Sequence, residues 1–149
     1  MRKHYSREIT VDRPIADAFP LFTPRGEEGW VPGWKPDYFA PEGGETEKDM
    51  LFATGEGEER TWWTCLDWLP DKHFVRYLRL TPGSRAAFVE IECRARDAKT
   101  TLVTVSYDIQ ALGAPGERYI ADMTDEAFAG MIGEWPELIS KMPREQRPS

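Results

Sequence analysis

Tryptophan is the residue type best suited to build a ligand site in this sequence, which contains six tryptophans. An indole ring offers a large apolar surface and one N–H group that needs a partner when it is buried. Trp30 and Trp34 lie four residues apart in a segment rich in glycine, proline and aromatic residues. Such a pair can cover the mouth of a cavity, or it can fix the loop to the underlying structure. The sequence is compatible with both roles.

Three further tryptophans lie in residues 61–69, which form a predicted β-strand. Side chains alternate between the two faces of a strand. One face therefore carries Trp62, Thr64, Leu66 and Trp68, and the other carries Trp63, Cys65, Asp67 and Leu69. We expect the first set to point inward, because this orientation avoids burying the Asp67 carboxylate without a partner. For each of these aromatic residues, the alternative is ordinary core packing.

Residues 74–80 form a predicted strand in which one arginine must share the apolar face. The two possible apolar faces are Phe74, Leu78 and Leu80 with Arg76, or Val75 and Tyr77 with Arg79. A buried guanidinium needs a partner, because an isolated buried charge is costly. We expect Arg76 to face inward and to bind a carboxylate or phenolate group of a ligand. The alternative is an arginine near the strand end whose charged head reaches water.

Two later strands and the C-terminal helical segment supply the other expected wall residues. The strands contribute Val89, Ile91, Cys93, Val103, Val105, Tyr107 and Ile109, and the helical segment contributes Met123, Met131 and Trp135. Methionine adapts to varied ligand shapes, although a methionine stripe at helical spacing is also typical of a plain core. The expected ligand-binding residues are therefore Trp30, Trp34, Trp62, Thr64, Leu66, Arg76, Leu78, Ile91, Val105, Tyr107, Met131 and Trp135.

The sequence shows no pattern that is typical of a catalytic or metal centre. It has no nucleophile elbow, no phosphate-binding loop and no dinucleotide fingerprint. The two histidines and two cysteines show no metal-ligand spacing, and Cys65 and Cys93 are expected to be small core residues. We therefore expect no catalytic residue, no metal and no cofactor.

Composition favours one globular domain. The chain has 149 residues, a formal net charge of -7 and a mean hydropathy of -0.57, which fits a single domain over residues 1–149 with a frayed tail at 143–149. The 26 acidic residues against 19 basic ones argue against nucleic-acid binding, since phosphates are bound by clustered cations. No apolar run approaches the ~18 residues of a membrane-spanning helix. No signal-peptide pattern follows Met1, so we expect a cytoplasmic protein.

The predicted elements give an α+β architecture. Residues 5–12 form a strand, Asp12 caps a short helix that begins near Pro14, and residues 24–41 form a broken helix or an ordered loop. Strands follow at residues 50–54, 61–69, 74–80, 86–95 and 101–112, and the short turns between them make neighbours antiparallel. Residues 117–141 form one long amphipathic helix with a kink at Pro136.

Several segments taken together resemble a known superfamily. The sequence ITVDRP at residues 9–14 leads into Ala18 and Phe19, and WVPGW follows at residues 30–34. TVSY at residues 104–107 precedes ALG at residues 111–113, and an amphipathic helix then reaches Trp135. In this order they resemble the START-like helix-grip superfamily, also called SRPBCC. It includes polyketide cyclases and aromatases, lipid-transfer domains and plant pathogenesis-related proteins.

The resemblance covers nearly the whole chain and implies both a fold and a function. The implied fold is a curved antiparallel sheet of six or seven strands wrapped around the long C-terminal helix, with two short helices after the first strand. One helix cannot fill a strongly curved concave face everywhere, so a cavity is expected between the two. We expect this cavity to bind a hydrophobic or aromatic small molecule, which could be lipid-like, in a monomer or homodimer.

Two other functions are compatible with the sequence. One is an enzyme similar to the polyketide cyclases and aromatases, in which Arg76 or Tyr107 polarises a carbonyl group. The other is a protein-interaction module similar to heat-shock-chaperone activators, with an exposed apolar patch and an interior filled by side chains.

Overall fold

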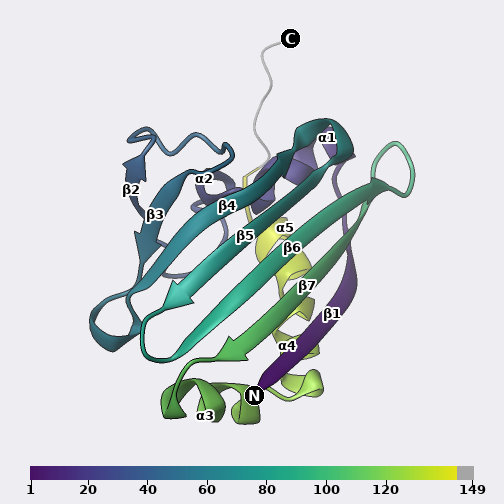
Figure 1. Ribbon diagram of the computed structural model, residues 1–149. Coiled ribbons are helices and arrows are strands. Elements are labelled where there is room, and N and C mark those ends of the chain that lie inside the picture. The colour runs from purple at the N-terminus through teal and green to yellow at the C-terminus, as the bar shows by residue number, and fades with distance from the viewer. Residues whose placement is uncertain (144–149) are drawn as a thin grey trace.

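A seven-stranded antiparallel sheet forms the frame of the protein (Figure 1). The computed structural model describes residues 1–143, so the expected frayed tail lies outside the described residues except for Pro143. The strands lie in the order β1-β7-β6-β5-β4-β3-β2 across the sheet. Their bounds are β1 Arg2–Val11, β2 Asp37–Ala40, β3 Leu51–Thr54, β4 Thr61–Leu69, β5 Phe74–Thr81, β6 Arg85–Ala95 and β7 Thr101–Ala111. The predicted α+β class and its strands are confirmed, and β2 lies within the segment expected to be irregular.

Strands β6 and β7 form the central floor of the core. Buried residues alternate with more exposed ones along both strands, which is the pattern of a sheet with one covered face. Their register sets Val89 beside Tyr107 and Ile91 beside Val105. Such cross-strand apolar pairs are the main stabilising unit of an antiparallel sheet. The residues that this register aligns therefore define the inner surface.

Three short helices follow β1, in agreement with the expected short helical segments. They are α1 Ile15–Ala18, the 3-10 helix η1 Phe19–Phe22 and α2 Pro24–Glu27. Pro14 occupies the N-cap position of α1 and makes no side-chain cap bond. The N-cap position expected at Asp12 is therefore wrong by two residues, because the helix begins at Ile15.

Thr23 fixes the start of α2 against η1. Its hydroxyl donates to the carbonyl of Pro20 at 2.7 Å and accepts from the amide of Gly26 at 3.0 Å. A Cβ atom at Gly26 would overlap the Pro20 carbonyl, so the close contact between α2 and η1 requires glycine at this position. This packing determines where α2 lies above the sheet.

The C-terminal helical segment consists of three helices. These are α3 Ala114–Asp122, α4 Asp125–Gly133 and α5 Trp135–Ser140. The segment is interrupted at Glu134, two residues before the kink predicted at Pro136. Pro136 lies in the first turn of α5, where its missing N–H group costs nothing. The expectation of one continuous helix over residues 117–141 is wrong, because Met123 leaves the helical conformation and Thr124 caps a new helix.

Side chains from the first strand and the loop after it donate hydrogen bonds to carbonyl groups of these helices. The Tyr5 hydroxyl donates to the carbonyl of Met123 at 2.8 Å, at the break between α3 and α4. Arg7 donates to the carbonyl of Ala129 in α4, and Arg13 Nη2 donates to the carbonyl of Ile139 at 3.0 Å. These bonds hold α4 and α5 along β1.

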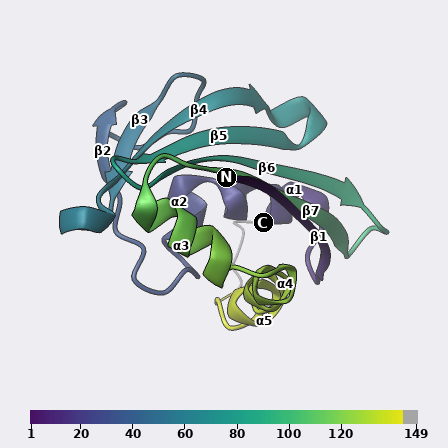
Figure 2. The same ribbon diagram turned by 60° about the horizontal axis from the view of Figure 1, so that its bottom comes forward.

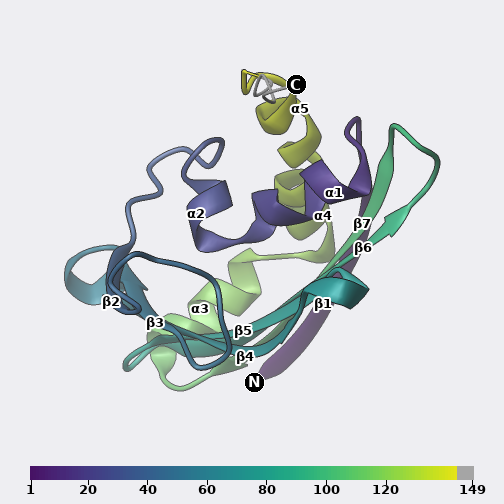
Figure 3. The same ribbon diagram turned by 90° about the horizontal axis from the view of Figure 1, so that it is seen from above.

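Within residues 1–143, the α-helices lie on one side of the sheet and leave its opposite side uncovered (Figures 2 and 3). The sheet bends around the helices, which is the predicted helix-grip arrangement. The core between them contains the largest fully buried side chains, among them Phe22, Phe52, Phe128 and Met50. Within residues 1–143, no helix is both long and apolar enough to cross a bilayer.

A β-bulge changes the direction of side chains midway along β4. Cys65 pairs with Tyr77 of β5, but the next paired residue is Asp67, opposite Arg76, so Leu66 is an extra residue. A bulge of this kind bends the strand and shifts its alternation. As a result, Cys65 is fully buried, while Asp67 lies outside within 3.9 Å of Arg76.

The bulge contradicts the predicted inward face of β4. Trp62 is 46% exposed and stacks on Phe39 with ring centroids 5.5 Å apart. Thr64 shares that outer face, Leu66 occupies the bulge, and Trp68 faces inward as predicted, stacked on Phe19. The prediction assumed unbroken alternation up to Asp67, whereas the extra residue allows the strand to bury Cys65 and still expose Asp67.

The short strand β2 lies at one edge of the sheet. It has four residues, its pairing with β3 shifts between Tyr38 and Ala40, and Pro41 follows it directly. The opposite edge is β1, whose ten residues pair with β7. The two edges therefore differ greatly in length.

The cap at Thr124 gives a testable consequence. Replacing Thr124 by alanine removes the hydroxyl that accepts from the amide of Ala127 at 3.0 Å. We expect the free energy of unfolding to fall by about 1 kcal/mol, as measured by urea denaturation. Thr124→Ser keeps the hydroxyl and should lose much less. Equal losses in the two variants would contradict the assigned cap.

Candidate functional site

A cavity of about 360 Å³ lies between the inner face of the sheet, α2 with the loop after it, and the last two helices. It reaches the surface and is lined mainly by apolar atoms. Its lining residues are Pro24, Glu27, Trp30, Val31, Pro32, Trp34, Phe52, Trp63, Tyr77, Arg79, Val89, Ile91, Tyr107, Met131, Glu134, Trp135 and Leu138. A cavity of this size with few polar groups is typical of a small-molecule site.

Two clusters of aromatic rings form much of the wall. In the first, Trp34, Phe52 and Trp63 are in mutual contact, with ring centroids 5.4 to 6.2 Å apart. In the second, Trp30 packs edge to face on Trp135 at 5.3 Å. Edge-to-face and offset stacking are the favourable arrangements for aromatic pairs. The rings are thus held in place by one another and present flat, rigid surfaces to the cavity.

The protein itself satisfies the indole N–H groups of three of these tryptophans. Trp30 donates to the carbonyl of Leu21 at 2.8 Å, and Trp34 donates to the carbonyl of Pro24 at 2.9 Å. Trp63 donates to the hydroxyl of Thr54 at 3.0 Å. Since these donors are already used, the three indoles offer only apolar ring surface to a ligand. They also anchor the loop, so Trp30 and Trp34 both line the cavity and fix the segment that carries them.

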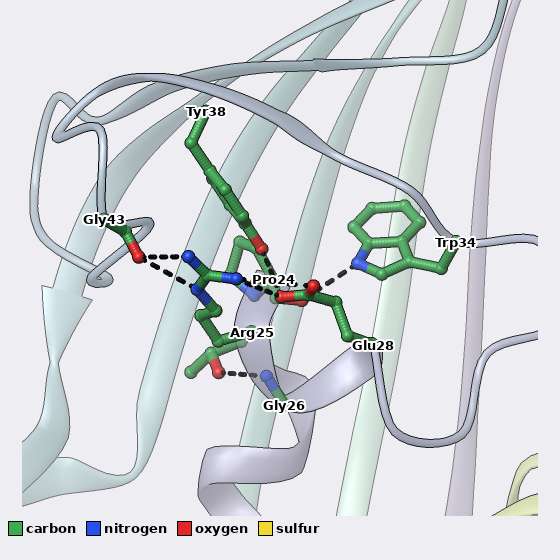
Figure 4. A network of polar contacts seen from close by, with 8 residues as sticks. Pro24, Arg25, Gly26, Glu28, Trp34, Tyr38 and Gly43 are labelled. Carbon is green, nitrogen blue, oxygen red and sulfur yellow. Dashed lines mark hydrogen bonds and ion pairs between the residues drawn. The ribbon is translucent and has the colours of Figure 1, made fainter.

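A network of polar contacts joins α2 to the β2 region (Figure 4). Arg25 donates to the carbonyl of Gly43 through Nε at 2.9 Å and Nη2 at 2.6 Å, and it pairs with Glu28 at 3.0 Å. The hydroxyl of Tyr38 donates to the same Glu28 carboxylate at 2.9 Å. These contacts fix the orientation of α2, and with it the direction of Glu27 toward the cavity.

Arg79 is the cation of the cavity. It lies on the inner face of β5 with Val75 and Tyr77, which are 0% and 3% exposed. Its guanidinium carbon lies 4.8 Å from the ring centre of Tyr107 and 5.6 Å from that of Trp63. Arginine over an aromatic face is a favourable cation–π arrangement. The rings therefore hold the guanidinium in the cavity wall.

The expected inward position of Arg76 is wrong, and so is that of Leu78. Both lie on the outer face of β5, where Arg76 pairs with Glu90 at 3.2 Å and lies over the ring of Phe88 at 4.7 Å. Leu78 is beside Phe88 in the register. The outer face of this strand carries its own apolar residues, so the alternation of apolar side chains did not distinguish the two faces.

Glu27 is the second ionisable group directed into the cavity. Burial raises the pKa of its carboxyl to about 8, and the positive charge of Arg79 opposes this effect. A carboxyl group removed from water favours its neutral form. At pH 7 Glu27 is therefore mostly protonated and can donate a hydrogen bond.

Two tyrosines complete the polar part of the wall, and they have different partners. Tyr77 donates its hydroxyl to the carbonyl of Phe22 at 3.1 Å, which ties β5 to η1. Burial raises the pKa of Tyr107, and the Arg79 guanidinium opposes this rise. Tyr107 packs edge to face on Phe128 at 5.0 Å. Its ring lies under the Arg79 guanidinium, with the ring centre 4.8 Å from the guanidinium carbon.

The cavity brings together half of the residues expected to bind a ligand. Those that line it are Trp30, Trp34, Ile91, Tyr107, Met131 and Trp135. Val105 is fully buried in the core beneath the cavity and does not line it. Trp62, Thr64, Leu66, Arg76 and Leu78 also lie away from it, for the reasons given above.

Sequence reasoning missed ten of the seventeen residues that line the cavity. The largest or ionisable ones among them are Glu27, Phe52, Trp63, Tyr77 and Arg79; the others are Pro24, Val31, Pro32, Glu134 and Leu138. Tyr77 and Arg79 could have been identified from the sequence, because the face that carries Val75, Tyr77 and Arg79 was one of the two inner faces considered for this strand. Trp63 could be identified only if the bulge in β4 were known, and Glu27 only if the position of α2 were known.

Cys65 and Cys93 are buried core residues, and burial raises the pKa of each thiol to about 12.

The raised pKa of Glu27 predicts a pH dependence of stability. The unfolded carboxyl ionises near pH 4.5 and the folded one near pH 8, so the folded state holds a proton that the unfolded state releases between these values. The contribution of Glu27 to stability is therefore lost as pH rises from 4.5 to 8, by at most ~1.4 kcal/mol per pH unit. Glu27→Gln should gain stability relative to wild type over this range, as measured by urea denaturation at pH 5, 6.5 and 8. Glu42→Gln, at an exposed carboxyl, is the control, and parallel profiles for wild type and Glu27→Gln would contradict the assignment.

Comparison with known proteins gives matches only at the level of structure. No family model and no curated protein matches the sequence. Norcoclaurine synthase from Thalictrum flavum, solved with dopamine and hydroxybenzaldehyde, aligns with a TM-score of 0.66 and 11% identity over 97% of this chain and 90% of that chain. A hypothetical protein from Helicobacter pylori aligns with a TM-score of 0.71 and 8% identity, over 95% of this chain and 88% of that one.

A third similar structure is DynU16, a protein from the dynemicin biosynthetic locus. It aligns with a TM-score of 0.62 and 14% identity over 93% of this chain, which corresponds to 47% of the longer DynU16 chain. At these identities the likeness concerns the fold. The sheet order, the short helices after β1 and the C-terminal helices in the concave face agree with it. The chain therefore has the helix-grip fold.

Proposed function

We propose that the protein binds a hydrophobic or aromatic small molecule in the cavity between the sheet and the C-terminal helices. The observation that carries this proposal is the set of tryptophan rings around an open space of about 360 Å³. Three of these indoles are fixed by their own hydrogen bonds. Rigid aromatic walls bind flat apolar molecules at low entropic cost, because few side chains must be ordered on binding.

A related observation supports the same proposal. Norcoclaurine synthase, which shares this fold, was solved in complex with two small aromatic molecules. The aromatic wall in the present protein offers a surface of matching chemistry. An interaction module of the chaperone-activator type was expected to have an interior filled by side chains, and the cavity does not meet that condition.

Ligand binding predicts a linked gain in stability. A ligand that binds only the folded state stabilises it by about 2.7 kcal/mol at a concentration of 100 Kd. Titration with a panel of flat aromatic and lipid-like compounds should raise the Tm and quench tryptophan fluorescence for at least one chemical class. The absence of any response across a broad panel would contradict the proposal.

A matched pair of variants tests whether binding occurs in this cavity. Met131→Trp adds a ring to the cavity wall and should reduce the affinity of any ligand found by at least tenfold, as measured by calorimetry. Leu51→Trp adds the same ring at a position that is 51% exposed, and it should leave the affinity unchanged. Equal affinities for the two variants would place the bound molecule outside the cavity.

A second candidate function is catalysis of the cyclase or aromatase type on a polyketide-like substrate. The observation that favours it is a carboxyl with a pKa of about 8, Glu27, that faces the same cavity as Arg79 and Tyr107. A carboxylate with a raised pKa can take a proton from a carbon next to a carbonyl group, and a guanidinium can stabilise the enolate oxygen that forms.

This second candidate has its own test. Incubation with a poly-β-ketone analogue should give a cyclised product, at a rate that rises with pH up to about 8 as Glu27 ionises. Glu27→Gln should reduce the rate by about 100-fold or more, while Glu42→Gln should not. A protein that binds the analogue but forms no product, as judged by mass spectrometry and absorbance, would be a binding protein only.

A further inference from the structure

Among the described residues, Arg79 has no carboxylate partner, in contrast to Arg76 and Arg85 of the same sheet. Arg76 pairs with Glu90 at 3.2 Å, and Arg85 pairs with Glu59 at 3.0 Å. None of the ion pairs formed among residues 1–143 includes Arg79, and its Nη2 atom is buried without a hydrogen-bond partner. A buried donor on a charged group that stays unsatisfied costs free energy. The cavity therefore contains a donor that lacks its acceptor.

Glu27 does not supply the missing negative charge at neutral pH. It faces the same cavity, but its carboxyl is mostly protonated at pH 7 because burial raises its pKa to about 8. Glu134, the other acidic residue of the lining, is exposed, so water screens its charge. The inner part of the cavity thus carries one uncompensated positive charge beside apolar rings.

We infer that the cavity selects an aromatic carboxylate, with the ring among the tryptophans and the carboxylate on the guanidinium of Arg79. This inference rests on the proposed function and adds a ligand class to it. Guanidinium and carboxylate groups match in shape and can form two parallel hydrogen bonds. A carboxylate in this position supplies the acceptor that Arg79 Nη2 lacks, and the protonated Glu27 leaves that charge unopposed.

The same arrangement makes binding depend on pH. The titratable groups that interact with Glu27 or share the cavity with it are Arg79 and Tyr77 on β5, Tyr107 on β7, Tyr38 on β2, and Glu134. Arg25 and Glu28 lie near it in the sequence and are paired with each other. Of these, Arg79 is the cation directed into the cavity. Loss of the Glu27 proton adds a negative charge that competes for Arg79 and repels a bound carboxylate. The affinity for a carboxylate should therefore fall as pH rises above about 8, by at most tenfold per pH unit.

Three probes with the same ring system, similar size and different charge test the inference on the full chain. They are naphthalene-2-carboxylate, the neutral naphthalene-2-carboxamide and the cationic naphthalen-2-ylmethylamine, each titrated by calorimetry at pH 6.5. We expect the carboxylate to bind at least tenfold more tightly than the amide, and the amine to bind most weakly. Between pH 7 and 9.5 the affinity for the carboxylate should fall while that for the amide stays constant.

Variants connect the preference to its residues. Arg79→Met should abolish the preference for the carboxylate over the amide, whereas Arg76→Met, on the outer face of the same strand, should leave that preference intact. Glu27→Gln should keep the preference and remove the fall in affinity above pH 8. If Arg79→Met does not fold, the affinities of the wild-type chain and of Glu27→Gln for the three probes still test whether the cavity selects an anion.

Each other outcome overturns the inference. Equal binding of amide and carboxylate, or tighter binding of the amine, would show that the cavity does not select an anion, and the proposed small-molecule function would stand. A preference for the carboxylate that survives Arg79→Met would place the anion elsewhere. If no aromatic compound of any charge binds, the proposed function fails as well.

Discussion

The extra residue in β4 determines which side chains reach the interior of this protein. Residues before Leu66 and residues after it alternate in opposite phase, so Cys65 is buried and Asp67 is exposed although they lie only two positions apart. With this shift, Trp63 faces inward beside Phe52 and Tyr77. One irregular position thus supplies an aromatic wall and keeps an acidic side chain in solvent, where its charge costs little.

The division of the C-terminal helical segment has a comparable effect on the opposite wall. A straight helix would cover one line across the concave sheet, whereas the breaks at Met123 and Glu134 allow three helices to follow its curvature. Trp135 begins the last helix at the second break and packs on Trp30. The helices cover the sheet and still leave a space beside α2, where the tryptophans and Arg79 meet.

The overall fold could be predicted from the sequence because it depends on patterns that span many residues. Alternation along β6 and β7, short turns between strands and the apolar stripe after Gly113 all act over whole elements. The site was predictable only in part, since single positions decide it. The bulge in β4 and an outer face of β5 with apolar neighbours such as Phe88 reversed expected orientations, and the cap at Thr124 divided the expected helix. Burial in the folded structure raises the pKa of Glu27, and no local sequence pattern predicts this burial.

The two unequal edges of the sheet affect how readily copies of this protein aggregate at high concentration. An exposed strand edge can recruit a strand from another molecule and so begin ordered aggregation. The β2 edge offers only four residues, carries an irregularity and ends at a proline that has no N–H to donate. The longer β1 edge bears charged side chains, including Arg2, Glu8 and the inward-facing Arg7. Both edges of the sheet therefore disfavour pairing with strands of other molecules. The protein thus combines an open cavity with sheet edges that do not promote aggregation.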